Sequence, residues 1–157
     1  MKPTKFINLV YLTFAVGIVG FFVIQQLVGN GLPAPTVELN IILIQPALAL
    51  ILFLSALPIL RYRSGLKKFQ DNKGQRPKPV DPIYAVRSLA FAKSVSLTGS
   101  VFVGWQAAII VYQLLAPQTA SLLNPILGTV GALVMVAVGL IVENYFRIPP
   151  DQDGDAA

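Results

Sequence analysis

Four uninterrupted apolar stretches constrain the fold of this chain more than any other feature of its sequence. They lie at about 6–28, 40–60, 94–115 and 122–146. The core of a bilayer is about 30 Å thick, and roughly 20 helical residues cross it because each adds about 1.5 Å. The sequence therefore predicts an all-α integral membrane protein, a single four-helix bundle with four spans.

The composition excludes several other classes of protein. Charged residues make up only 12% of the 157 residues, about half of the roughly 25% found in soluble domains. A water-soluble domain could not cover its surface with so few charges. The sequence has neither Cys nor His, which excludes disulfides, haem ligation and zinc sites built on these residues.

The first apolar stretch follows Lys2 and Lys5, as the apolar core of a signal peptide would. Such a core is usually about 7–15 residues long and precedes a cleavage site of small residues. The stretch 6–28 is longer and runs into Gly29 and Asn30. We therefore expect a retained membrane anchor, with cleavage as the alternative.

The positive charges lie on one side of the predicted membrane. Of the 12 Lys and Arg, two precede the first span, nine lie between Arg61 and Lys93, and Arg147 follows the fourth span. The connections 29–39 and 116–121 contain none. Because cytoplasmic loops carry the excess of Lys and Arg, we expect both termini and the segment 61–93 on the cytoplasmic side of the cell membrane.

The segment 61–81 is predicted to be a basic cytoplasmic linker, with a turn or two of helix before a stretch rich in Pro and Gly. Asp81 and Pro82 form a helix start, since Asp caps free amides and Pro suits the first helical position. Residues 82–93 are therefore the expected cytoplasmic start of the third helix. The tail 148–157 is acidic and lacks the terminal Glu of a calcium-binding EF-hand loop, so we expect it to be solvated.

Three motifs mark the start, the third helix and the end of the sequence. They are the opening Met1-Lys2-Pro3-Thr4, the segment 85–93 followed by Gly99 and Gly104, and the ending 142–150 with its acidic tail. Together they resemble a family of short actinobacterial membrane proteins that is known only as a domain of unknown function. The resemblance covers essentially the whole sequence. It implies a gene that often lies beside folate-biosynthesis genes, and it implies no activity.

Small residues recur at every fourth position of the third span and face small residues in the first and fourth spans. Small side chains let two helix backbones approach closely in a membrane. We expect these positions to pack helices inside the bundle, and the alternative is a surface that docks another membrane protein. The predicted packing residues are Gly17, Gly20, Ala92, Ser96, Ser100, Gly104, Ala108, Gly128, Gly131 and Ala132.

Polar side chains within the spans are the first place to look for function in a membrane protein. Gln45 and Gln106 lie inside the second and third spans without a charged companion in the sequence of those spans. Gln113 and Asn124 lie near the outer ends of their spans, where we expect them to reach headgroups or water. Ionisable residues in the middle of a span, which a proton or ion pathway needs, are missing from all four stretches.

One ion pair is predicted between the third and fourth spans. In a hairpin symmetric about residues 118–119, Lys93 and Glu143 would lie at the same depth, just inside the cytoplasmic interface. A paired charge is tolerated there better than a lone one. The alternative is that Glu143 pairs with Arg147 four residues later, the favourable helical order, while Lys93 extends to the headgroups.

Basic residues flank the second and third spans. Each Lys or Arg close to the surface is attracted to anionic lipids by about 1 kcal/mol. Docking of a protein or of a nucleic acid is the alternative, although the segment offers few aromatic residues for stacking on bases. The predicted headgroup contacts are Arg61, Arg63, Lys67, Lys68 and Arg87.

The residue patterns that catalysis needs are missing from the sequence. It has no Ser–His or Cys–His pair, no paired carboxylates within the spans and no Gly-rich phosphate loop. We therefore expect no catalytic residues and no cofactor. From the composition and the basic segment discussed above, we also expect no metal and no nucleic-acid partner. The expected function is that of a non-catalytic accessory, scaffold or assembly protein for a membrane partner. The alternatives are a transporter or permease for a small solute or lipid, and then a membrane-embedded enzyme.

Overall fold

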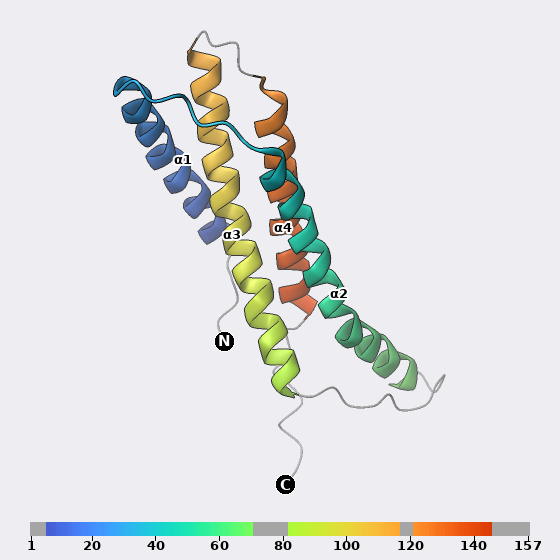
Figure 1. Ribbon diagram of the computed structural model, residues 1–157. Coiled ribbons are helices and arrows are strands. Elements are labelled where there is room, and N and C mark those ends of the chain that lie inside the picture. The colour runs from blue at the N-terminus through green and yellow to red at the C-terminus, as the bar shows by residue number, and fades with distance from the viewer. Residues whose placement is uncertain (1–5, 71–81, 117–120, 146–157) are drawn as a thin grey trace.

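The computed structural model is all-helical and describes residues 6–70, 82–116 and 121–145 (Figure 1). All four helices are long and apolar enough to cross a membrane. The expected all-α class with four candidate spans is therefore confirmed, and the chain is a multi-pass membrane protein. The helices are α1 (Phe6–Gly29), α2 (Leu39–Gln70), α3 (Pro82–Leu115) and α4 (Leu123–Tyr145).

The end of α1 follows from a glycine at the helix C-terminus. Gly31 has a φ of 80°, in the left-handed region that glycine adopts without a steric penalty. The N–H of Leu32 donates to the carbonyl of Leu27 at 3.1 Å, and that of Gly31 donates to Val28 at 2.9 Å. These two bonds form a Schellman cap, which satisfies the last carbonyls of the helix.

The other helix bounds follow the local sequence in the same way. α3 begins at Pro82, the position where the sequence places its start, because proline loses no hydrogen bond in a first helical turn. The Oγ of Ser121 accepts a hydrogen bond from the N–H of Leu123 at 3.3 Å and so caps α4. α2 continues to Gln70, so the first part of the predicted linker 61–81 is helical. The rest of that linker and the acidic tail lie outside the described residues.

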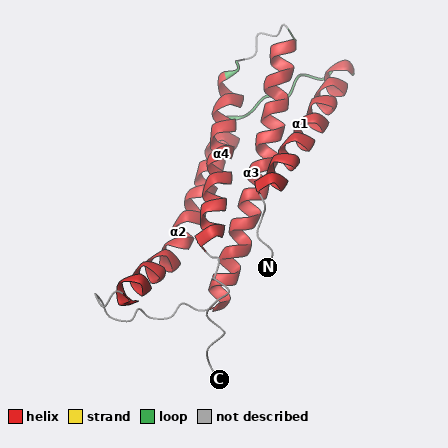
Figure 2. Cartoon of the chain, turned by 180° about the vertical axis from the view of Figure 1, so that it is seen from behind, coloured by secondary structure: helices red, strands yellow, loops and turns green. Residues whose placement is uncertain are grey.

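The four helices lie in the spatial order α1, α3, α4, α2 (Figures 1 and 2). Among the described residues α1 contacts α3 and neither α2 nor α4, whereas α2 packs on α4 and less extensively on α3. The consecutive helices α1 and α2 therefore lie on opposite flanks of the α3–α4 hairpin. The predicted four-helix bundle is open along α1.

The segment 30–38 joins α1 to α2 across one end of the α3–α4 hairpin (Figure 1). We call this the short-loop end, and the opposite end, where α1 and α3 begin and α2 and α4 finish, the basic end. Val37 is buried in a cluster with Ile24, Ala108 and Ile109. Its carbonyl accepts a hydrogen bond from Asn124 Nδ2 at 3.3 Å. The crossing segment is thus attached to α1, α3 and α4.

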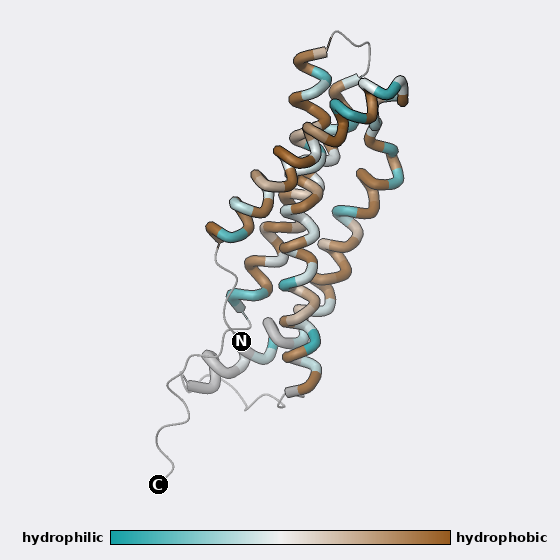
Figure 3. Tube along the Cα trace, turned by 90° about the vertical axis from the view of Figure 1, so that its left-hand side faces the viewer, coloured by the Kyte–Doolittle hydropathy of each residue, from teal (hydrophilic) through white to brown (hydrophobic). Residues whose placement is uncertain are grey.

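Small side chains make up much of the core between α2, α3 and α4. Many large apolar side chains of the four helices are exposed, as expected of surfaces that face lipid, and Figure 3 shows that apolar residues predominate along the helices. Lipid tails are as apolar as these side chains, so close packing rather than the hydrophobic effect holds the helices together. The buried core residues are Ala49, Leu52, Ala56, Ala92, Val95, Met135 and Val142.

Candidate functional site: the packed faces of helix α3

The predicted stripe of small residues on α3 is buried along its whole length, from Ala92 to Ala108. An advance of four residues turns about 400° around an α-helix, or about 40° beyond one full turn. Over the stripe these increments add up to about 160°. The stripe therefore faces α4 at one end and α1 at the other, which places α3 in the centre of the molecule.

The backbones of α1 and α3 are in direct contact where the two helices cross. A Cβ atom added at Gly104 would stand 2.5 Å from the carbonyl oxygen of Thr13 and 3.1 Å from the amide nitrogen of Gly17. The hydroxyl of Thr13 donates to the carbonyl of Ser100 at 3.2 Å, as well as to Leu9 within its own helix. Gly104 thus allows the close approach on which the attachment of α1 depends.

The two predicted glycines of α1 also face α3. A Cβ at Gly17 would lie 3.5 Å from the carbonyl oxygen of Gly104. A Cβ at Gly20 would lie 3.1 Å from the ring of Trp105 and 3.2 Å from the Cβ of Ala108. Both glycines thus lie in the α1–α3 contact.

The contact between α3 and α4 is equally close at the basic end of the stripe. A Cβ at Gly139 would stand 2.8 Å from the Cβ of Ser96 and 3.0 Å from the carbonyl oxygen of Ala92. Further along the hairpin, a Cβ at Gly99 would lie 3.1 Å from the carbonyl oxygen of Ala132. The predicted residues Ala92, Ser96 and Ala132 therefore lie in the α3–α4 contact.

The remaining predicted glycines, Gly128 and Gly131 of α4, pack against side-chain amides. A Cβ at Gly128 would stand 2.7 Å from Nε2 of Gln106, and one at Gly131 would stand 2.9 Å from Oε1 of Gln45. The sequence identified these glutamines as polar residues within spans but did not connect them with α4. Only the helix register brings the two kinds of residue together.

Gln113 corrects one expectation. Its side chain is only 9% exposed and its Oε1 is buried, so most of this side chain is packed among the helices and not open to headgroups or water as expected. Gln113 lies seven residues after Gln106, which is two turns and the same face of α3. Its side chain is therefore directed to the packed side of the helix. Asn124, by contrast, is exposed as expected.

The hairpin of α3 and α4 is shifted from the symmetric register that the sequence suggested. That register would place Gly139 level with Thr98, but Gly139 lies against Ala92 and Ser96. The shift is roughly one helical turn, about 5 Å. Glu143 is buried and Lys93 is half-buried. Their ion pair stays a prediction.

We expect a charge exchange between Lys93 and Glu143 to reveal this pair. Lys93→Glu and Glu143→Lys should each lower the thermal stability of the protein in detergent, and the double exchange should recover much of the loss. Residues in contact show coupling energies of about 0.5–3 kcal/mol in such a cycle. A double variant whose loss is the sum of the single losses would contradict the pair. Arg147, the alternative partner of Glu143, lies outside the described residues.

The predicted headgroup contacts lie near the basic end. Arg61 and Arg87 have exposed side chains. Arg63, Lys67 and Lys68 belong to the last turns of α2, and their side chains lie outside the part of the chain that the structure describes. Their binding to lipid headgroups stays a prediction.

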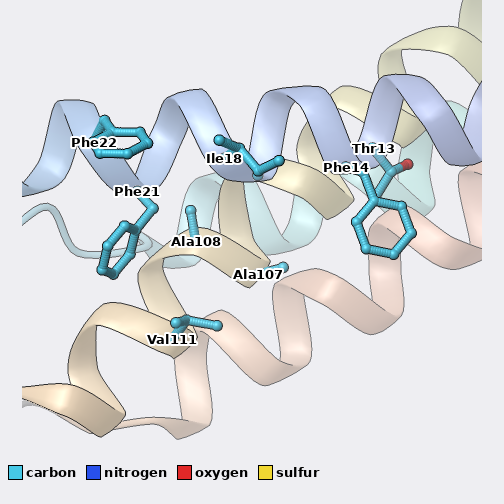
Figure 4. A pocket seen from close by; sticks show the side chains of 9 residues that line it. Thr13, Phe14, Ile18, Phe21, Phe22, Ala107, Ala108 and Val111 are labelled. Carbon is cyan, nitrogen blue, oxygen red and sulfur yellow. The ribbon is translucent and has the colours of Figure 1, made fainter.

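An apolar groove with a volume of about 460 Å³ runs between α1 and α3 (Figure 4). Small residues, Gly17 and Ala107 among them, line it beside the large side chains of Phe14, Ile18 and Phe22. The groove lies on the open flank of α1, the side that none of the other described helices covers.

The comparison with protein families decides where the chain belongs. A family model with the description "Protein of unknown function (DUF3180)" matches residues 9–150. The chain belongs to this family. The DUF3180 match covers all or nearly all of each of the four helices, so the architecture described above is that of a family member. No curated protein and no solved structure shows significant similarity to the chain.

Proposed function

We propose that this DUF3180 protein is a non-catalytic accessory or scaffold protein that binds a second membrane protein along α1. The observation that carries the proposal is the one-sided attachment of α1, which packs on α3 alone among the described helices. The groove beside it combines Gly17 and Ala107 with large walls. Small residues of this kind allow a transmembrane helix to approach closely.

The open flank of α1 also offers polar groups to a partner. Gln26 lies one turn after Phe22, and both line a second hollow together with Asn30. A side-chain amide can form a hydrogen bond with a partner helix, an interaction that stabilises association in membranes alongside packing. The open flank of α1 therefore offers a partner helix both close packing and hydrogen bonds, two interactions that hold helices together in a membrane.

Affinity purification in mild detergent, followed by mass spectrometry, tests the proposal. We expect one membrane protein to copurify in a fixed ratio, and to be lost from the Gly104→Leu variant, in which α1 is displaced. Gly29→Leu is the matched control because a Cβ at Gly29 meets nothing within 4 Å. A homo-oligomer without any other protein would contradict the proposal.

The basic end is proposed to face the cytoplasm of the cell membrane, in contact with anionic lipids. The positive-inside rule supports this orientation, since Arg61, Arg87 and Lys93 all lie towards that end. A reporter fused after Phe69 is expected to be cytoplasmic, and one inserted near Pro35 external. An external signal from the fusion at Phe69 would overturn the orientation.

The alternative function, a permease for a small solute, has one specific observation in its favour. The side chains of Gln45 and Gln106 place hydrogen-bonding groups inside the helix assembly, where each is 1% exposed. Amides without charge would suit a neutral solute. Uptake of glycerol or urea by proteoliposomes, faster than by protein-free liposomes, would favour this function over the scaffold.

A further inference from the structure

Three glutamines, Gln45 of α2 and Gln106 and Gln113 of α3, have buried side-chain amides. Gln45 and Gln106 are each 1% exposed and Gln113 is 9% exposed. Within residues 6–70, 82–116 and 121–145, both polar atoms of Gln45 and Gln106 and the Oε1 of Gln113 have no hydrogen-bond partner. All three residues lie in the half of their helix nearer the short-loop end.

The side-chain amides of Gln45 and Gln106 pack against two glycines of α4. As described above, Gln106 Nε2 and Gln45 Oε1 lie 2.7 Å and 2.9 Å from the positions that Cβ atoms would take at Gly128 and Gly131. These glycines are three residues apart, so they share one face of α4 and are separated by about 4.5 Å along its axis. One amide from α2 and one from α3 therefore meet the same short stretch of α4.

The chemistry of these amides determines what they can bind. An amide buried in an apolar environment without a partner is costly, because no water replaces its lost hydrogen bonds. Each glutamine amide has two N–H donors and one C=O acceptor. A cation would satisfy only the C=O groups, and an anion only the N–H groups. A neutral molecule with a donor and an acceptor satisfies both kinds of atom.

The spacing agrees with a small guest. Gln106 and Gln45 meet α4 at two levels about 4.5 Å apart along its axis, and one small molecule that makes two hydrogen bonds of about 2.8 Å each can bridge levels that close. Gln113 offers a further amide about 10 Å nearer the short-loop end, on the same face of α3. Buried amides therefore occur both in the interior and nearer that end of α3.

We propose that Gln45 and Gln106 form an intramembrane binding site for one small neutral molecule that both donates and accepts hydrogen bonds. Water is the smallest molecule of this class, and a small polyol or amide is the larger kind. Gln113 supplies the next hydrogen-bonding group on the route from the short-loop end. The site lies away from the open flank of α1 and does not depend on a protein partner.

NMR spectroscopy of the protein in detergent micelles, with ¹⁵N-labelled glutamine, tests this site. The variants Gln45→Met and Gln106→Met identify the two signals. We expect cross-peaks from the Nε2 protons of both residues to bound water. Titration with glycerol and urea separates the two kinds of guest, because a solute site gives saturable shifts of both signals and a water site gives none. Cross-peaks between the two amides, with none to water and no shift with solute, would overturn the site.

Two variants test whether the amides share one guest. Gly128→Ala places a methyl group against Gln106 Nε2. The cross-peaks to water, or the shifts caused by the solute, should therefore fall at least threefold at Gln45 and Gln106. Those at Gln113 should remain. Gly29→Ala is the control. If Gly128→Ala does not fold, Gln106→Met removes the amide with little change in side-chain size, and the signal at Gln45 should fall by a similar factor. A signal at Gln45 that Gln106→Met leaves unchanged would overturn the shared site.

Discussion

Gly104→Leu is expected to release α1 from α3 while α2, α3 and α4 stay packed. A Cβ at this position would stand 2.5 Å from the carbonyl oxygen of Thr13, and a backbone atom cannot move aside as a side chain can. Overpacking of a close contact costs about 1–3 kcal/mol, and we expect the upper part of this range. The effect is local because α1 contacts only α3 among the described helices.

Thiol cross-linking between two introduced cysteines measures this release directly. The chain has no cysteine of its own, so only the introduced pair can react. Phe21 and Tyr112 have ring centroids 6.5 Å apart, so cysteines at these positions report the α1–α3 contact. Cysteines at Val37 and Asn124, which share a hydrogen bond, report whether the other end of the crossing segment stays on α4. Gly104→Leu should lower the first cross-link several-fold and leave the second. The prediction would be contradicted if each cysteine pair gave the same cross-linking yield in Gly104→Leu as in the control Gly29→Leu.

Gly139→Leu is expected to destabilise the whole protein rather than one helix. Its Cβ would stand 2.8 Å from the Cβ of Ser96 and 3.0 Å from the backbone carbonyl oxygen of Ala92. These atoms belong to the α3–α4 contact, on which α1 and α2 both depend for their positions. We expect a loss of about 3 kcal/mol or more, at or beyond the upper end of the overpacking range.

Thermal unfolding in detergent, followed by circular dichroism, measures this loss. The midpoint of Gly139→Leu should lie below that of Gly104→Leu, and both cross-links, at Phe21–Tyr112 and at Val37–Asn124, should weaken together. Gly29→Leu should unfold like the parent protein. A Gly139→Leu variant with an unchanged midpoint would show that the α3–α4 contact is not the centre of the fold.

The spans could be predicted from the sequence because length and hydropathy alone decide whether a helix can cross a bilayer. The predicted spans 6–28 and 122–146 differ from α1 (Phe6–Gly29) at one end and from α4 (Leu123–Tyr145) at both ends, by one residue each time. The predicted second span 40–60 likewise agrees with the candidate span Leu39–Pro58, and the turn or two of helix expected after it is longer, since α2 runs on to Gln70. Leu66, Lys67 and Lys68 are good helix formers, and they prolong the helix beyond its apolar part.

The order of the helices could not be predicted, because apolar residues surround each span. In a soluble bundle an apolar stripe marks the buried face of a helix, but here exposed Phe14 and buried Ile24 are equally apolar. The amide site was missed for a related reason. Its recognition needs the positions of Gln45 and Gln106 against Gly131 and Gly128. The shifted register of the α3–α4 hairpin sets only the position of Gln106, and the packing of α2 on α4 sets that of Gln45.

Photo-cross-linking in native membranes tests most directly whether α1 is the partner-binding helix. A photoreactive residue at Ile18 lies on the open flank, and Leu50 of α2 is its matched control because the two side chains are 59% and 58% exposed. Both lie eleven residues from the short-loop end of their helix. We predict one protein adduct from Ile18 that is absent at Leu50 and is lost in the Gly104→Leu background. Lipid adducts alone from both positions would contradict the account.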